Sequence, residues 1–197
     1  MKFPGVAALA LLLTLTGCAS MQRADAHFQG TALAIAQAPD FTLTSDSGRL
    51  WTLSSRHGKN VALFFGYTHC PDTCPATLAK LAKAVDLQGG KASNVEIAFV
   101  TVDPQRDTPS VMKKYIAHFE GANIVGLTGT PAQVAGVEHE YHVWAQRIPG
   151  NHTGKDDYDD AHSSVVYLID RDGNERVLHG DDDSLNSFTA DLHTLVQ

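Results

Sequence analysis

Hydrophobic residues along the chain form short continuous runs that alternate with longer segments of helical periodicity. Residues 61–65 and 95–102 are largely apolar, which is typical of central strands covered on both faces. Between them, apolar side chains recur at helical spacing and predict a helix over 75–87. A strand, a helix and a second strand in this order predict an α/β domain.

Turn and capping residues divide the rest of the chain. Asp46-Ser47-Gly48 lies between two strand-like segments, 41–44 and 50–53, and predicts a β-hairpin. Thr108-Pro109 and Thr130-Pro131 each join a capping residue to a proline, so each predicts the start of a helix. The remaining elements are expected as strands at 124–127, 143–147, 164–169 and 176–179, and as helices at 109–119, 131–141 and 184–196.

The order of these elements is that of a thioredoxin-like domain, with a mixed central sheet flanked by helices and an N-terminal β-hairpin. We expect this domain to occupy residues 39–197. Residues 151–160 are rich in Asp and Lys, and they predict a long polar loop. Residues 19–38 show little periodicity, which is typical of a flexible tether.

The first residues carry the pattern of an export signal. Lys2 precedes an apolar run that is too short to cross a bilayer as a helix, and Leu15-Thr16-Gly17-Cys18 follows this run. These four residues resemble a bacterial lipobox, in which the cysteine becomes the lipidated N-terminus. We therefore expect a signal peptide over 1–17 and a lipidated tether over 18–38, anchored to a membrane of the bacterial cell envelope. The alternative is an ordinary secretory peptide, cut just beyond the cysteine.

Composition narrows the class of protein further. The 197 residues are 43% hydrophobic and 19% charged, as expected of a globular domain that can bury its own core. The formal net charge is −7 and the chain has no run of Lys or Arg, which argues against nucleic acid as a partner. Three cysteines are too few for a disulfide scaffold, so each needs its own explanation.

Cys70 and Cys74 carry the candidate chemistry. They lie in the segment that follows the first buried strand and opens a helix, which is where ligand sites of α/β sheets occur. Four residues apart, the two side chains share one helix face, and the helix N-terminus favours the thiolate form of Cys70. Such a pair can hold a soft metal ion or cycle between dithiol and disulfide. It can also form a structural disulfide, which would stabilise little because the loop is short.

A metal site needs a third ligand, and His162 is the histidine best placed to supply it. It precedes the strand predicted over 164–169, and in a thioredoxin-like sheet the loop before that strand faces the cysteine loop. Cu(I) prefers thiolates and accepts imidazole as a partner. Six other histidines are expected to be solvated or to lie at helix ends: His57, His118, His139, His142, His179 and His193.

Three acidic residues near the cysteines have less specific expectations. Asp72 is expected to cap the helix or to hold negative charge near a metal ion, and Asp103 and Asp107 are expected to be turn and capping residues. A thioredoxin-type enzyme keeps two residues between its cysteines and a proline before the facing strand. This chain has three residues there and Ser164 in place of the proline, so a thiol-disulfide reductase is the alternative rather than the preferred function.

Three motifs together resemble the Sco/SenC family. They are Phe65-Gly66-Tyr67-Thr68-His69-Cys70-Pro71-Asp72-Thr73-Cys74-Pro75, Val100-Thr101-Val102-Asp103-Pro104-Gln105-Arg106-Asp107-Thr108-Pro109 and Tyr158-Asp159-Asp160-Ala161-His162-Ser163. The resemblance covers about 39–196. Members of this family are membrane-tethered thioredoxin-like proteins that bind copper through the two motif cysteines and a distant histidine. They assist assembly of the dinuclear copper centre of cytochrome c oxidase.

The resemblance implies that Cys70, Cys74 and His162 bind copper, as Cu(I) and also as Cu(II). It implies a metallochaperone rather than an enzyme, with an apo copper-acceptor protein, the copper subunit of cytochrome c oxidase, as its partner. The alternative is an extracytoplasmic thioredoxin-like thiol-disulfide reductase in which the two cysteines form the redox pair. The family usually has Asp directly before the histidine, whereas this chain has Ala161, with Asp160 one place earlier.

Overall fold

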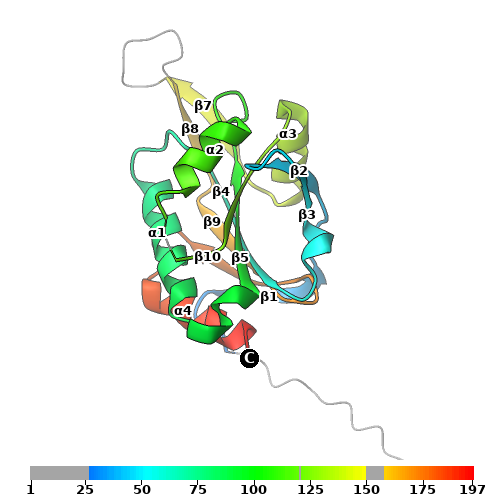
Figure 1. Ribbon diagram of the computed structural model, residues 1–197, viewed down its shortest axis with the longest axis vertical. Helices are drawn as coiled ribbons and strands as arrows, with labels where there is room; N and C mark the ends of the chain where they lie inside the picture. The colour runs from blue at the N-terminus through cyan, green and yellow to red at the C-terminus, as the bar shows by residue number, and fades with distance from the viewer. Residues whose placement is uncertain (1–26, 120, 150–157) are drawn as a thin grey trace, which may run out of the picture.

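The centre of the molecule is a mixed sheet of eight strands (Figure 1). The computed structural model describes residues 27–119, 121–149 and 158–197. Along the sheet the strands are ordered β1-β10-β9-β4-β5-β6-β2-β3, and β7 and β8 form a separate two-stranded sheet. The strands are β1 (Thr31–Gln37), β2 (Thr42–Ser45), β3 (Leu50–Thr52), β4 (Asn60–Gly66), β5 (Val95–Thr101), β6 (Ile124–Thr128), β7 (Ala145–Pro149), β8 (Tyr158–His162), β9 (Val165–Ile169) and β10 (Asn174–Gly180).

Helices flank this sheet, as the hydrophobic pattern predicts. Helix α1 packs against α4 and β5, and α2 packs against β6. Prolines stand in the first turns of α2 and α3, and each helix is capped by the threonine before it. The helices are α1 (Thr73–Asp86), α2 (Pro109–Ile116), α3 (Pro131–Glu140) and α4 (Leu185–Leu195), with short 3-10 turns η1 (Leu53–Arg56) and η2 (Gly89–Asn94).

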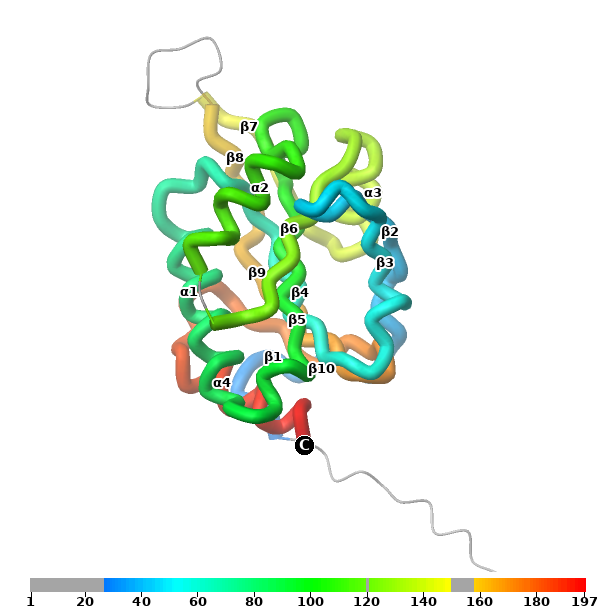
Figure 2. The backbone as a smooth tube through the Cα atoms, viewed as in Figure 1, coloured from blue at the N-terminus to red at the C-terminus, as the bar shows by residue number. Residues whose placement is uncertain are grey.

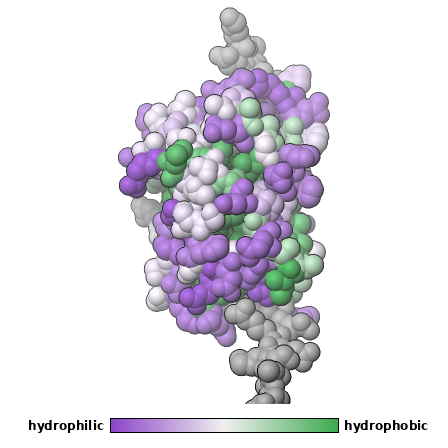
Figure 3. Space-filling view, turned by 90° about the vertical axis from the view of Figure 1, so that its right-hand side faces the viewer, coloured by the Kyte–Doolittle hydropathy of each residue, from purple (hydrophilic) through white to green (hydrophobic). Residues whose placement is uncertain are grey.

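The core lies on both faces of the two central strands. Every residue of β4 and β5 is buried, which explains their unbroken apolar character. Phe64 and Phe65 are consecutive in β4 and therefore face opposite sides of the sheet. Phe64 contacts Phe99 with ring centroids 5.8 Å apart, whereas Phe65 contacts Tyr141, just beyond α3, at 5.7 Å. Hydrophilic residues cover most of the outer surface on the β2–β3 side (Figure 3).

The topology brings two loops to one edge of the sheet. Strands β4, β5 and β6 are parallel neighbours, so the segments that follow β4 and β5 leave from the same edge. The backbone N–H of Val102 donates to the carbonyl of Gly66 at 2.8 Å and joins the ends of β4 and β5. The β7–β8 hairpin lies at one end of the long axis of the molecule, whereas α4 and the C-terminus lie at the other (Figures 1 and 2).

The mixed sheet, the flanking helices and the β2–β3 hairpin confirm the predicted α/β fold. The N-terminal boundary of the domain was wrong. Residues 31–37 are not part of a tether: they form β1, which pairs antiparallel with β10 at the edge of the sheet. β1 is almost entirely exposed, so its side chains carry no strong alternation of apolar and polar residues that would reveal a strand.

The polar segment before His162 is also more ordered than its composition indicates. Residues 158–160, expected at the end of a polar loop, belong to β8, which pairs antiparallel with β7. The strand expected over 143–147 begins at Ala145 and lies outside the main sheet. The sequence pattern does not predict β8 because one face of this strand is formed by the polar residues Tyr158, Asp160 and His162.

The expected signal peptide over 1–17 and the lipidated Cys18 lie outside the described residues. Within the described residues, no helix combines the length and apolar character that a membrane span requires. The first described residues already belong to the domain: the backbone N–H groups of Gln29 and Gly30 donate to the carboxylate of Asp191 at 2.7 and 2.9 Å. The folded domain therefore begins about ten residues earlier than the sequence pattern predicts.

Candidate metal centre

The two cysteines stand at the N-terminus of α1, immediately after the buried strand β4. Both are free thiols; Cys70 is half-buried and Cys74 is fully buried. Asp72 occupies the N-cap position of α1, but its side chain makes no capping hydrogen bond. Instead, the backbone N–H of Cys74 donates to Cys70 Sγ at 3.3 Å. The sulfur thus takes the place of a capping oxygen, and the positive end of the helix stabilises its thiolate.

His162 comes from the other side of the site, at the end of β8. Its Nε2 lies 3.5 Å from Cys74 Sγ, as the predicted ligand set requires. Its Nδ1 lies 3.1 Å from the carbonyl oxygen of Ser163. Because a carbonyl only accepts, Nδ1 carries the hydrogen, and in the neutral ring the lone pair of Nε2 points toward the sulfur. Tyr67 packs against the ring edge-to-face, with centroids 5.8 Å apart.

The spacing between Cys74 and His162 fits one metal ion. At the bond lengths known for zinc, about 2.3 Å to sulfur and about 2.0 Å to nitrogen, an angle of about 110–120° at the metal separates the two ligand atoms by roughly 3.5–3.7 Å. The sulfur–nitrogen distance of 3.5 Å lies in that range. Two thiolates and an imidazole are the soft donor set that suits Cu(I), and the imidazole also suits Cu(II). The spacing of Cys74 and His162 therefore fits a shared metal ion, and the three donor types suit the copper that the motifs imply.

The two thiols differ strongly in acidity. Hydrogen bonding from the Cys74 thiol, with backbone hydrogen bonds from Cys74 and Asp72 at the helix N-terminus, lowers the pKa of Cys70 to about 4 despite its partial burial. The reverse holds for Cys74: the hydrogen bond to Cys70, burial and the charge of the Cys70 thiolate raise its pKa. In the metal-free protein the pair therefore exists as one thiolate and one thiol, with the proton on Cys74.

This asymmetry predicts an ordered alkylation of the reduced, metal-free protein. Iodoacetamide is expected to modify Cys70 first, at a rate that changes little between about pH 6 and pH 8, because only a thiolate reacts and Cys70 is already ionised there. Peptide mass spectrometry after timed quenching measures the order. The variant Cys70→Ser is the control, because Cys74 is then the one thiol of the pair that can react. A rate that rises about tenfold for each pH unit in that range would contradict the prediction.

A glycine keeps space for the buried sulfur. A Cβ at Gly66, the last residue of β4, would lie 2.8 Å from Cys74 Sγ and 2.8 Å from the ring of Phe99. Real Cβ atoms essentially never approach another atom so closely, and neither neighbour can move aside in a fully buried setting. Gly66 is therefore required for the close approach of strand β4 to the sulfur of Cys74.

Asp107 ties the cysteine loop to the sheet. Its buried carboxylate accepts hydrogen bonds from the backbone N–H of Thr68 at 2.9 Å, from Thr68 Oγ1 at 2.6 Å and from Thr101 Oγ1 at 2.6 Å. The sequence predicted a capping role for Asp107, but Thr108 caps α2 instead. The motif that contains Asp107 is thus part of the support of the metal centre, in a role that only the fold reveals.

The domain matches a known family over nearly all of its described length. The SCO1/SenC family model matches residues 29–197. The chain belongs to the SCO1/SenC family. This match begins ahead of β1 and agrees with the domain boundary that the structure shows.

Individual relatives agree with the family assignment. A SCO2-like protein of Rickettsia felis is 36% identical over 134 residues, which is 68% of this chain and 64% of that protein. The match therefore spans somewhat less than two thirds of the relative. The structure of Bradyrhizobium japonicum ScoI with copper bound has 38% identity and a TM-score of 0.72, covering 81% of this chain and 99% of that one. BsSco, described as a member of the Sco family of cytochrome c oxidase assembly proteins, shares the fold at 20% identity and a TM-score of 0.66, covering 85% and 96%.

Ala161 is the visible departure of this SCO1/SenC chain from its family pattern. In β8, Asp160 and His162 point to one face and Ala161 to the other, because successive strand residues alternate. Asp160 is buried, and its carboxylate accepts a hydrogen bond from Arg106 Nη2 at 3.2 Å. The acidic residue beside the histidine thus lies on the same face of the strand as the imidazole and is held by an arginine.

The six histidines that were expected to be solvated or to lie at helix ends follow this prediction with one exception. His57, His118, His139, His142 and His193 are exposed. His179, expected to be solvated, is fully buried: Nδ1 lies 2.8 Å from Asp183 Oδ2 and Nε2 lies 3.0 Å from Asp191 Oδ2. The prediction for His179 was wrong because its burial depends on α4, whose packing a local pattern does not reveal.

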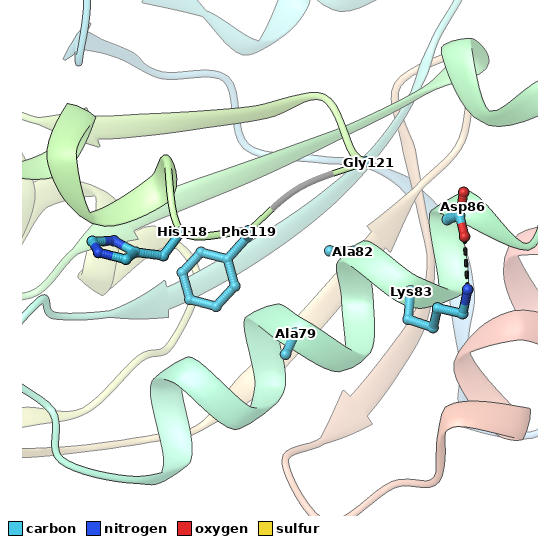
Figure 4. A pocket seen from close by; sticks show the side chains of 7 residues that line it. All are labelled: Ala79, Ala82, Lys83, Asp86, His118, Phe119 and Gly121. Carbon is cyan, nitrogen blue, oxygen red and sulfur yellow. Dashed lines mark hydrogen bonds and ion pairs between the residues drawn. The ribbon is translucent and has the colours of Figure 1, made fainter.

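A hollow on the surface, away from the cysteines, does not offer two thiols and an imidazole. It has a volume of about 420 Å³ and lies between the second half of α1 and the segment after α2 (Figure 4). Its side chains offer one imidazole and one carboxylate, and the carboxylate of Asp86 is paired with Lys83 at 2.8 Å. The lining residues are Ala79, Ala82, Lys83, Asp86, His118, Phe119 and Gly121. The candidate chemistry therefore stays with the cysteines and His162.

Proposed function

We propose that this protein is a copper metallochaperone that binds copper through Cys70, Cys74 and His162 and passes it to an acceptor protein. The observation that carries the proposal is the approach of His162 Nε2 to Cys74 Sγ at 3.5 Å, with the other ring nitrogen held by a carbonyl. Residues 88 positions apart in the chain are brought to metal-ligand spacing by the fold. A structural role for the cysteines would not need this imidazole.

The three ligands differ in burial, and this difference bears on how copper is held and released. Cys74 is the fully buried residue of the three, whereas Cys70 and His162 are half-buried and border the surface. Binding copper requires the proton of Cys74 to leave, so loading releases a proton. An acceptor that offers its own thiolates or thioethers would meet the copper from the side of Cys70 and His162, and the metal would move by stepwise exchange of ligands.

The acceptor that we propose is the copper subunit of cytochrome c oxidase, where the dinuclear copper centre is assembled. This rests on membership of a family that the BsSco structure associates with cytochrome c oxidase assembly. We further propose that lipid on Cys18 anchors the protein to a membrane of the bacterial cell envelope, with the domain outside the cytoplasm. The cargo is proposed as Cu(I), and Cu(II) is compatible with the same ligands.

A transfer experiment tests this function. The reduced domain is loaded anaerobically with one equivalent of Cu(I) and mixed with the metal-free, reduced soluble domain of an oxidase copper subunit. After separation, the copper is expected on the acceptor, and a Cys70→Ser, Cys74→Ser variant is expected to deliver none. Failure of the parent domain to retain copper against a competing chelator, or retention of all copper after mixing, would contradict the proposal.

A second function is favoured by the acidity of Cys70. A half-exposed thiolate beside a buried thiol is the arrangement of a thiol-disulfide reductase. Cys70 would attack one sulfur of the acceptor's disulfide, and Cys74 would then resolve the mixed disulfide. The acceptor gains two electrons and two thiols, while Cys70 and Cys74 become a disulfide. Metal-free reduced protein mixed with a disulfide-containing acceptor domain distinguishes this activity, because His162→Ala should leave it nearly unchanged.

A further inference from the structure

We propose that Arg106 is a positioning residue for the metal centre: its guanidinium fixes the β7–β8 hairpin, and hence His162, over the cysteines. This inference rests on the proposed copper site. It concerns how the histidine side of that site is held, because β7 and β8 form a sheet of their own. The ladder of the main sheet therefore does not extend to the hairpin, and side-chain contacts help to set its position.

The guanidinium of Arg106 connects three groups at once. Nη1 donates to the backbone carbonyl of Tyr158 at 2.8 Å, Nη2 donates to Asp160 Oδ2 at 3.2 Å, and Nε donates to Asp103 Oδ2. Tyr158 and Asp160 belong to β8, whereas Asp103 follows β5. The side chain of Arg106 is 16% exposed, and those of Asp103 and Asp160 are 0% and 7% exposed. Such a planar fork with several donors is a geometry that only arginine supplies.

Tyr158 completes the clamp by stacking. Its ring lies between two guanidinium groups, with Arg106 and Arg147 each 3.6 Å from the ring centroid. Its hydroxyl donates to the carboxylate of Asp103, at 2.9 Å from Oδ1 and 3.1 Å from Oδ2. Arg147 Nη2 lies 3.6 Å from Asp103 Oδ1. Asp103, expected to be a turn or capping residue, is therefore the buried centre of contacts between β7, β8 and the segment after β5.

The same short segment also holds the cysteine side of the site. Asp107, one residue beyond Arg106, binds Thr68 in the loop that leads to Cys70. Residues 103–107 thus contact the loop of the cysteines through a carboxylate and the strand of the histidine through a guanidinium. Because Asp160 and His162 lie on the same face of β8 two residues apart, a shift at Asp160 is transmitted to the imidazole.

Removal of the guanidinium would leave two negative charges without their cation. Asp103 and Asp160 are both buried, and Arg106 forms an ion pair with each of their carboxylates. Without Arg106 the two carboxylates repel each other, and the carbonyl of Tyr158 loses its donor. The strand β8 would then relax away from the segment after β5, and His162 would move with it.

A double-mutant cycle tests the proposal. Arg106→Met and His162→Ala are made singly and together, and Cu(I) affinity is measured by competition with a chelator. In the parent background Arg106→Met is expected to weaken Cu(I) binding about tenfold or more, as loss of a group that orients a metal ligand does. In the His162→Ala background the same change is expected to alter affinity less than about twofold, because the histidine through which it acts is gone.

Arg176→Met is the matched control. Arg176 is 14% exposed and pairs with Asp170 at 3.0 Å. Its replacement therefore removes an ion pair comparable to those of Arg106, but this pair lies at the β9–β10 turn. It is expected to lower thermal stability without changing copper affinity. Where Arg106→Met does not fold, Arg106→Lys takes its place in the cycle, since lysine keeps the charge but cannot bind three groups in a plane.

A readout without copper separates the positioning role from the proposed function. In the metal-free protein, the NMR signals of the His162 ring are expected to shift in Arg106→Met and to stay unchanged in Arg176→Met. Unchanged ring signals, or an equal loss of copper affinity with and without His162, would overturn the positioning role. Failure of the parent chain to bind Cu(I) would overturn the proposed function while the ring signals still decide the role of Arg106.

Discussion

Replacement of His162 by alanine is expected to weaken Cu(I) binding by more than about 100-fold while both thiols remain titratable. Changing a group that merely orients a metal ligand already costs about 10–100-fold, so loss of the ligand itself should exceed this. The remaining cysteines can bind Cu(I) with two sulfurs only. Competition with a chelator under anaerobic conditions gives the affinity, and a thiol reagent gives the number of free cysteines.

His69→Ala is the control for that experiment. His69 is exposed and directly precedes Cys70, yet its Nδ1 contacts Thr68 Oγ1 at 3.1 Å rather than a cysteine. Its removal is expected to change Cu(I) affinity less than about threefold, because it is not among the ligands. Equal losses from both substitutions, or none from His162→Ala, would show that the imidazole of His162 does not bind the metal and would favour the reductase.

Asp107→Ala is expected to cost about 3 kcal/mol or more in the free energy of unfolding. Three hydrogen bonds end on this fully buried carboxylate, and one of their donors is the backbone N–H of Thr68. Hydrogen bonds to a charged group contribute about 1.5–3 kcal/mol each, and donors left buried without a partner add to the loss. For a domain of this size the melting temperature should fall by roughly 6–12 °C, which calorimetry measures.

Two further variants make that prediction specific. Asp107→Asn keeps the shape of the side chain but turns an NH₂ group toward donors, so its loss should lie between those of the parent and Asp107→Ala. Asp72→Ala, in the same region, removes an exposed carboxylate that makes no capping bond and should change stability by less than about 0.5 kcal/mol. A small effect of Asp107→Ala with an equal effect of Asp72→Ala would contradict the supporting role of Asp107.

The sequence predicts the centre of this fold well because its signals there are local. The buried strands β4 and β5 appear as apolar runs, and the helices α2 and α3 begin at a Thr-Pro pair. The cysteine pair is equally local, since four residues place both thiols at one helix start. The expected topology of the sheet predicts that His162 faces the cysteine loop, and the structure confirms its approach to Cys74.

Features that depend on distant partners could not be predicted in this way. β1 is an exposed edge strand, recognisable only once its pairing with β10 is known. The burial of His179 depends on Asp191 in α4, and the role of Arg106 depends on a carbonyl 52 residues away. The sequence does place Arg106 between two aspartates of one motif, but hydrophobic periodicity does not predict which groups its side chain contacts.

The hydrogen bonds from Gln29 and Gly30 to Asp191 fix where the N-terminal segment joins the domain. Asp191 belongs to α4, which lies at the opposite end of the long axis from the β7–β8 hairpin (Figure 1). An attachment to a lipid surface through the preceding residues would therefore hold the molecule by the end at which α4 lies. The proposed copper ligands beside the hairpin would face away from that surface, toward proteins that project beyond it, and a partner could dock without displacing the anchor.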